Sequence, residues 1–103
     1  MIVTTTNTIE GSSIKVYLGI VFGEVVEGID FVRDFKAGFT NFFGGRSGSY
    51  EEAMSETREA AIREMKKKAD ALGANAVVGV RIDYEMINNM LMITASGTAV
   101  VID

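Results

Sequence analysis

The side chains that could bind a ligand fall into two segments of this sequence. The first is a glycine-rich run with one guanidinium, Gly44, Gly45, Arg46, Ser47 and Ser49, placed just before a predicted helix. Backbone N–H groups and the positive end of a helix dipole favour a phosphate or carboxylate at such a place. The run lacks the Lys-Ser/Thr ending of a P-loop, and Ser49 also fits as a helix cap. A turn in which Arg46 pairs with an acidic side chain is the competing interpretation.

The second candidate is a row of charged side chains, Arg81, Asp83 and Glu85. Their spacing of two positions places them on one face of a predicted strand. Carboxylates of Asp83 or Glu85 from several copies of the chain could form a ring that binds a hard cation. Ordinary solvated or interface ion pairs are the alternative interpretation.

The side chains available as nucleophiles, general bases and metal ligands restrict the chemistry of the chain. The sequence contains no cysteine and no histidine, so it offers neither thiolate nor imidazole for nucleophilic catalysis, general base catalysis or zinc binding. The methionines of the predicted hairpin tip cannot all reach one copper(I), because Met86 points to the opposite face from Met90 and Met92. We therefore predict no enzyme activity, no catalytic residues, no metal site within one copy and no cofactor.

Charge and hydropathy exclude further partners. The net charge is −4, and the longest basic run is 66–68, so nucleic acid is not an expected partner. Residues 1–7 lack the basic and apolar regions of a secretory signal. The longest apolar stretch, 14–26, contains Lys15 and Glu24 and is too short for a membrane helix. We expect a cytoplasmic protein that does not contact a membrane.

The elements that must position the candidate residues form one domain over residues 1–103, because this length supports a single two-layer core. A strand is predicted over 14–26. A long amphipathic helix follows, which begins at a capping box starting at Ser49 and ends at Gly73. Two more strands form a hairpin whose turn is Asn88-Asn89.

The hairpin turn also predicts the register, because it places Ile87 opposite Met90. One face of the hairpin is then apolar or small and would pack on the helix: Ala76, Val78, Val80, Ile82, Tyr84, Met86, Leu91, Ile93, Ala95, Gly97, Ala99 and Val101. The other face is mostly polar: Arg81, Asp83, Glu85, Met92, Thr94, Ser96 and Thr98. We predict an α+β fold, a two-layer β-α-β-β sandwich with an antiparallel three-stranded sheet and one long helix, plus a short N-terminal strand over 2–5.

The strand over 14–26 is apolar on both faces, which a two-layer domain cannot cover. One predicted face holds Ile14, Val16, Leu18, Ile20 and Phe22, and the other holds Tyr17, Gly19, Val21, Gly23 and Val25. A short Phe-rich helix predicted after Asp30 adds an aromatic stripe, Phe31, Phe35, Phe39 and Phe42. A membrane-contact stripe would need more flanking basic residues, so core or subunit contact is favoured. We expect a homo-oligomer.

Several motifs resemble those of the YbjQ family, and together they span almost the whole chain. They are Thr4–Thr6, Tyr17–Gly19, Gly23-Glu24, Gly44–Ser47, Ala60-Ala61, Met65 and Gly73–Val80. The resemblance implies a heavy-metal-binding domain of unknown function. It also implies a dodecin-like β-α-β-β subunit that assembles into rings, with a pentamer as the implied assembly.

We predict from these observations a non-enzymatic, ring-forming protein that binds a small ligand, ion or partner at subunit junctions. Two alternatives remain. One is a metal-binding protein, as the family resemblance implies. The other is an enzyme or anion-binding protein that uses the glycine-rich run between Gly44 and Ser49.

Overall fold

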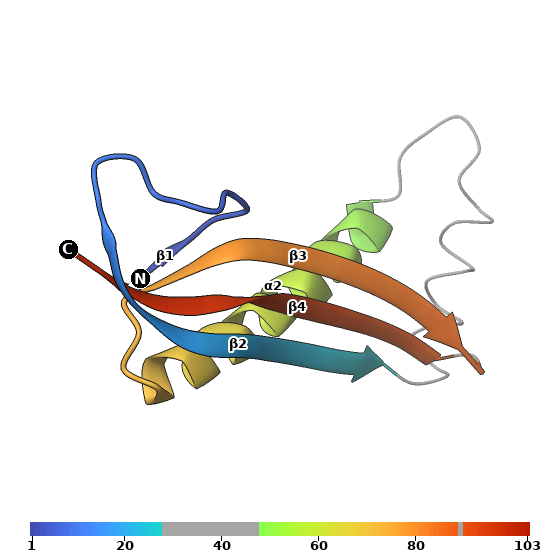
Figure 1. Ribbon diagram of the computed structural model, residues 1–103. Helices are drawn as coiled ribbons and strands as arrows, with labels where there is room; N and C mark the ends of the chain where they lie inside the picture. The colour runs from blue at the N-terminus through green and yellow to red at the C-terminus, as the bar shows by residue number, and fades with distance from the viewer. Residues whose placement is uncertain (28–47, 89) are drawn as a thin grey trace.

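The computed structural model of the chain describes residues 1–27, 48–88 and 90–103 (Figure 1). A four-stranded sheet forms one layer, and one long helix lies across a single face of it. The face turned away from the helix is called the outer face. The elements are β1 (Ile2–Val3), β2 (Ile14–Glu27), α2 (Gly48–Ala71), β3 (Ala76–Ile87) and β4 (Met90–Ile102).

The strand order is β1-β3-β4-β2. Because β4 is antiparallel to both β2 and β3, those two strands are parallel to each other, and α2 is the crossover between them. This confirms the predicted β-α-β-β sandwich. The sheet has four strands rather than three, because the short N-terminal strand β1 pairs in parallel with the start of β3. The predicted Phe-rich helix lies outside the described residues.

Helix α2 ends at the predicted glycine. Gly73 has a φ of 90°, which favours a residue without Cβ. Its amide donates to the carbonyl O of Asp70 at 2.9 Å, and the amide of Ala74 donates to the carbonyl O of Ala69 at 3.1 Å. These two bonds form a Schellman motif, which satisfies carbonyl groups of the last turn.

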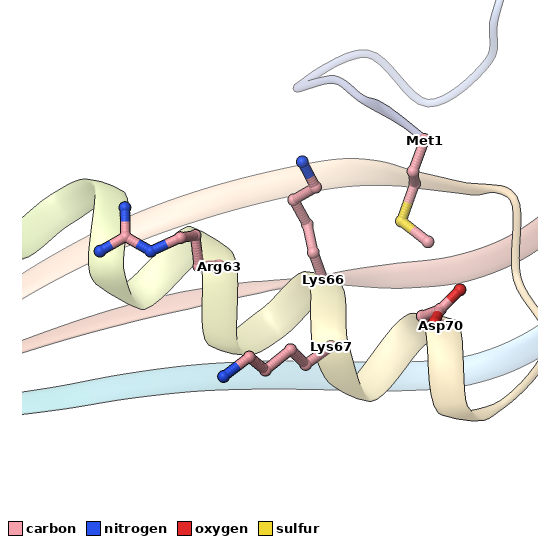
Figure 2. Close-up of a pocket in the computed structure, with 5 residues that line it drawn as sticks. All are labelled: Met1, Arg63, Lys66, Lys67 and Asp70. Atoms are coloured by element: carbon pink, nitrogen blue, oxygen red, sulfur yellow. The ribbon is translucent and has the colours of Figure 1, made fainter.

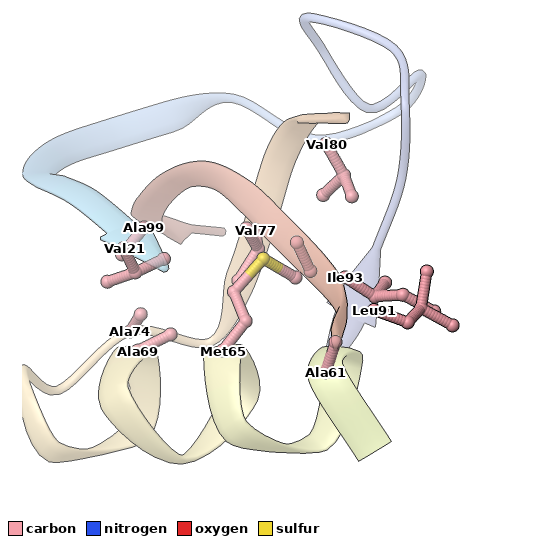
Figure 3. Packing of buried hydrophobic residues seen from close by; sticks show 11 residues of the cluster. Val21, Ala61, Met65, Ala69, Ala74, Val77, Val80, Leu91, Ile93 and Ala99 are labelled. Carbon is pink, nitrogen blue, oxygen red and sulfur yellow. The ribbon is translucent and has the colours of Figure 1, made fainter. Parts of the chain in front are cut away.

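The main core lies between α2 and the sheet (Figure 3). Four buried residues of the helix repeat at every fourth position and so lie on one face: Thr57, Ala61, Met65 and Ala69. The sheet contributes Val21, Val77, Val80, Leu91, Ile93, Ala95 and Ala99. Four of these seven come from β4, which lies between β3 and β2 and therefore forms the middle of the core.

The hairpin register is confirmed from Ile87 opposite Met90 to Arg81 opposite Ser96. Between Val78 and Arg81 the register shifts, and Gly79 lies in this irregularity with a φ of 62°. The extra residue reverses the alternation that follows from strand geometry. The prediction that Ala76 and Val78 face the helix is therefore wrong, and the core residue at this end is Val77.

Strand β2 has two similar irregularities, between Ile14 and Val16 and between Tyr17 and Gly19. As a result Leu18 packs against the helix-side core. The predicted grouping of Leu18 with Ile20 and Phe22 on one face is therefore wrong. The grouping of Tyr17 with Val21 is wrong as well, because Tyr17 lies opposite Val100 of the outer face.

A second, smaller apolar cluster covers the outer face at one end of the sheet. It contains Ala76, Val78, Val100 and Ile102, with Ile9 and Ile14 packed against it. The N-terminal segment is held there because Thr6 accepts a bond from the amide of Gly79 at 2.8 Å and Thr4 accepts one from Val80 at 3.1 Å. This end of the outer face is thus covered by the chain itself.

Candidate functional site

The glycine-rich run of the first candidate cannot be placed. Gly44, Gly45, Arg46 and Ser47 lie outside the described residues, and α2 begins at Gly48, one position before the predicted capping residue Ser49.

The second candidate lies on the outer face of β3, where Arg81, Asp83 and Glu85 are all exposed. Asp83 is opposite Thr94 of β4, and Thr94 is in turn opposite Glu24 of β2. The structure therefore brings Glu24 into the same row as Asp83. Glu24 could not be placed from the sequence, because no turn sets the register of β2 against β4.

This row does not form a cation site within one copy. The row supplies only two carboxylates, those of Glu24 and Asp83, with Thr94 between them, whereas a calcium ion takes about six to eight oxygen ligands. Within residues 1–27, 48–88 and 90–103 no group of three or more acidic, histidine or cysteine side chains could hold a metal ion. Among the described residues, a hard cation would need carboxylates from more than one copy.

Methionine thioethers also fail to converge in the described hairpin. Met86 is opposite Leu91, a residue of the helix-side core, whereas Met92 is opposite Glu85 on the outer face. The two sulfur-bearing side chains start from opposite faces of the sheet. Soft heavy metals prefer thiolate, imidazole or clustered thioether ligands, and the residues present do not fit such an ion.

The outer face of β2 carries large apolar side chains that no described residue covers. Tyr17 is 69% exposed, Ile20 70%, Phe22 45% and Val26 51%. They lie on the strand at the margin of the sheet, since β2 pairs only with β4 in the described part of the chain. This row of four residues is called the β2 patch below.

The other margin of the sheet is only partly covered. β1 pairs with Ala76 and Val77 of β3, and the backbone bonds of the N-terminal segment end at Val80. No described residue hydrogen-bonds to the free edge of residues 81–87. Within residues 1–27, 48–88 and 90–103, β2 and the later part of β3 therefore form the two edges of the sheet (Figure 1).

A hollow of about 380 Å³ lies between Met1 and the exposed side of α2 (Figure 2). It is lined by Met1, Arg63, Lys66, Lys67 and Asp70. The basic groups point in different directions, and Lys67 Nζ contacts Glu64 Oε1 at 3.3 Å. The hollow thus lacks convergent donors for an anion. No helix in the described ranges is both long and apolar enough to cross a membrane.

A four-stranded sheet covered on one face by a single long helix defines a small two-layer α+β domain. The chain belongs to the YbjQ family: residues 1–103 match the model of that family, which is described as "Putative heavy-metal-binding". A UPF0145 protein of Acetivibrio thermocellus is 63% identical over 106 residues, which cover 100% of both chains. UPF0145 proteins of Clostridium kluyveri and Listeria grayi are 60% and 57% identical, again with 100% of both chains covered.

A solved structure shares the fold. A Pediococcus pentosaceus protein of unknown function from the DUF74 family superimposes with a TM-score of 0.61 at 20% identity. The match covers 100% of this chain and 98% of that chain. The likeness therefore extends over the complete β-α-β-β arrangement.

Proposed function

We propose that this protein is a non-enzymatic, ring-forming binding protein of the cytoplasm. Its copies associate through β2, and a small ligand, an ion or a partner binds at the junctions between copies. The observation that carries this proposal is the β2 patch. Two of its side chains, Tyr17 and Ile20, are 69% and 70% exposed.

The β2 patch favours association because three of its large apolar side chains, Tyr17, Ile20 and Phe22, follow one another on the outer face before the charged Glu24. Complete burial of one large apolar side chain contributes about 1.5–3 kcal/mol. Monomeric proteins rarely leave a row of such residues in water, and exposed rows of this kind mark interaction surfaces. A second copy of the chain would supply matching apolar surface.

The backbone of β2 supports the same proposal. β2 runs for 14 residues, and its outer edge has no described hydrogen-bond partner. Natural edge strands are commonly protected by proline, by frequent charges or by a covering segment. The chain contains no proline, and a paired edge in an assembly would satisfy these backbone groups. The family resemblance adds a ring, and five is the subunit number it implies.

Metal binding is the second candidate, because the family description names heavy metals. The donor set limits it to oxygen ligands. In a ring, Asp83 or Glu85 from successive copies could surround a hard cation such as calcium. The enzymatic alternative at the glycine-rich run has no described residue in its favour.

A matched pair of variants tests the role of the β2 patch. Ile20→Asp places a charge in the patch, whereas Leu72→Asp places the same charge on an apolar side chain of similar size, 49% exposed, beyond the end of α2. We expect Ile20→Asp to shift the protein to monomers and Leu72→Asp to leave the assembly unchanged. Equal behaviour of the two variants would contradict the proposal.

A further inference from the structure

We propose that the ligand at the junctions between copies is a basic α-amino acid, bound by Arg81, Asp83 and Glu24 on the outer face. The inference rests on the proposed function, because it names the chemical class of the small ligand that the junctions would hold.

Two neighbouring rows of the outer face bring charges of both signs together. In one row Arg81 of β3 lies opposite Ser96 of β4. In the next row Thr94 of β4 lies between Asp83 and Glu24. Neighbouring strands are about 4.8 Å apart, and alternate residues of one strand are about 6.8 Å apart. The three charged side chains therefore start within about 12 Å of one another.

These charged side chains are exposed and unpaired within the described residues. No described residue forms an ion pair or a side-chain hydrogen bond with Arg81, Asp83 or Glu24. The half-buried hydroxyls of Thr94 and Ser96 also lack a side-chain hydrogen bond to any described residue. The two rows thus offer a guanidinium, two carboxylates and two hydroxyls to a ligand.

A ligand with one carboxylate and two cationic groups matches these side chains. Its carboxylate would accept hydrogen bonds from the Arg81 guanidinium, and its α-ammonium would donate to Asp83. Two such bonds of about 2.8 Å each, with one carbon between the two ligand groups, span about the distance between the two residues. The cation of the ligand side chain would reach Glu24 across Thr94.

Charge balance favours a basic amino acid over other small ligands. One guanidinium and two carboxylates leave one negative charge, which a ligand with one excess positive charge neutralises. A simple cation would leave Arg81 unpaired, and a simple anion would leave both carboxylates unpaired.

The junction between copies would make this site stronger. Exposed ion pairs contribute little, because water competes for both charges. Phe22 of the β2 patch lies opposite Ser96, so a copy that covers the patch borders the two rows and excludes water beside them. Burial of unpaired charges is costly, and the ligand would offset this cost by pairing all three.

Three small molecules of similar length test the ligand class by calorimetric titration of the natural chain. L-lysine carries all three groups, cadaverine lacks the carboxylate, and norleucine lacks the side-chain ammonium. We expect saturable binding of lysine with a Kd below about 1 mM. The other two should bind at least about tenfold more weakly, because each leaves a charged group of the site unpaired. Equal binding of lysine and cadaverine would overturn the proposal, as would no saturable binding of lysine, ornithine or arginine.

Variants assign the contacts. Arg81→Gln should weaken lysine binding by about tenfold or more and should not weaken the binding of cadaverine. Glu24→Gln should remove the preference for lysine over norleucine. Arg63→Gln, at an exposed position of α2, is the control and should leave lysine binding unchanged. The same lysine affinity in Arg81→Gln and Arg63→Gln would contradict the proposed site.

Light scattering on the same samples separates this inference from the proposed function. A ring that binds no basic amino acid would overturn only the ligand class. A natural chain that is monomeric in solution would instead overturn the proposed function itself.

Discussion

The backbone carbonyl of Ala61 occupies the space where a Cβ on Gly23 would stand. The amide N of Met65 lies against the same position. Helix α2 therefore rests directly on the backbone of β2 and seals its helix side. The apolar side chains of the β2 patch point the other way, where the described chain offers no cover.

Gly23→Ala should therefore destabilise the fold by about 3 kcal/mol or more, because the added methyl meets backbone atoms that cannot move aside. Urea unfolding followed by circular dichroism measures the change. Gly11→Ala is the control, since a Cβ there meets nothing within 4 Å and only its positive φ of 86° costs about 1–2 kcal/mol. Similar losses in both variants would show that the close helix contact is not as described.

Met65 fills the centre of the core and is fully buried. Met65→Ala should lower the free energy of unfolding by about 2–5 kcal/mol, through lost burial and the cavity left behind. Met86→Ala removes the same atoms from a side chain that is 46% exposed, and we expect less than about 1 kcal/mol. Thermal and urea unfolding of the two variants provide the comparison. A larger loss for Met86→Ala would contradict the described core.

Asn75 ties the end of α2 to the last strand. Its Nδ2 donates to the carbonyl O of Ile102 at 2.9 Å, and its Oδ1 accepts from the Ile102 amide at 2.7 Å. Asn75→Asp replaces the donor by an acceptor and should cost about 1–3 kcal/mol. Asn7→Asp, at an exposed position, should be nearly neutral. Hydrogen exchange at the Ile102 amide should be faster in Asn75→Asp and unchanged in Asn7→Asp, which would show that the loss of stability comes from this pair of hydrogen bonds.

The family description suggests a heavy-metal protein, but this chain has no cysteine or histidine. We expect calorimetric titration of the tag-free protein with cadmium to show no saturable binding at micromolar concentration. Thiolate or imidazole ligands would be needed for such affinity. Stoichiometric cadmium binding would contradict the conclusion that the chain lacks suitable ligands for a soft metal ion. Calcium binding that disappears in Asp83→Asn and Glu85→Gln variants would favour a shared carboxylate ring.

Much of the fold could be predicted from the sequence because several local signals agree. The Asn88-Asn89 turn and the alternation beside it gave the correct hairpin register. Gly73 gave the correct helix end. These features depend only on neighbouring residues.

The errors came from single extra residues, whereas the predicted antiparallel sheet with the last strand between the other two long strands is confirmed. Both Val77 and Val78 are apolar, so alternation could not reveal that an irregularity near Gly79 turns Val77 toward the helix. The place of Glu24 beside Thr94 depends on the register of β2 against β4, which no connecting turn sets and which two irregularities shift. The glycine-rich run from Gly44 to Ser47 stays a prediction, since it lies outside the described residues.

The central claim is that the β2 patch is covered by another copy of the chain. Light scattering coupled to gel filtration of the natural chain tests it most directly, at several protein concentrations. We expect a mass that is a multiple of 11.1 kDa, with five copies as the number that the family resemblance implies. A monomer at all concentrations would contradict the claim that another copy covers the β2 patch. A closed dimer would contradict the proposed ring.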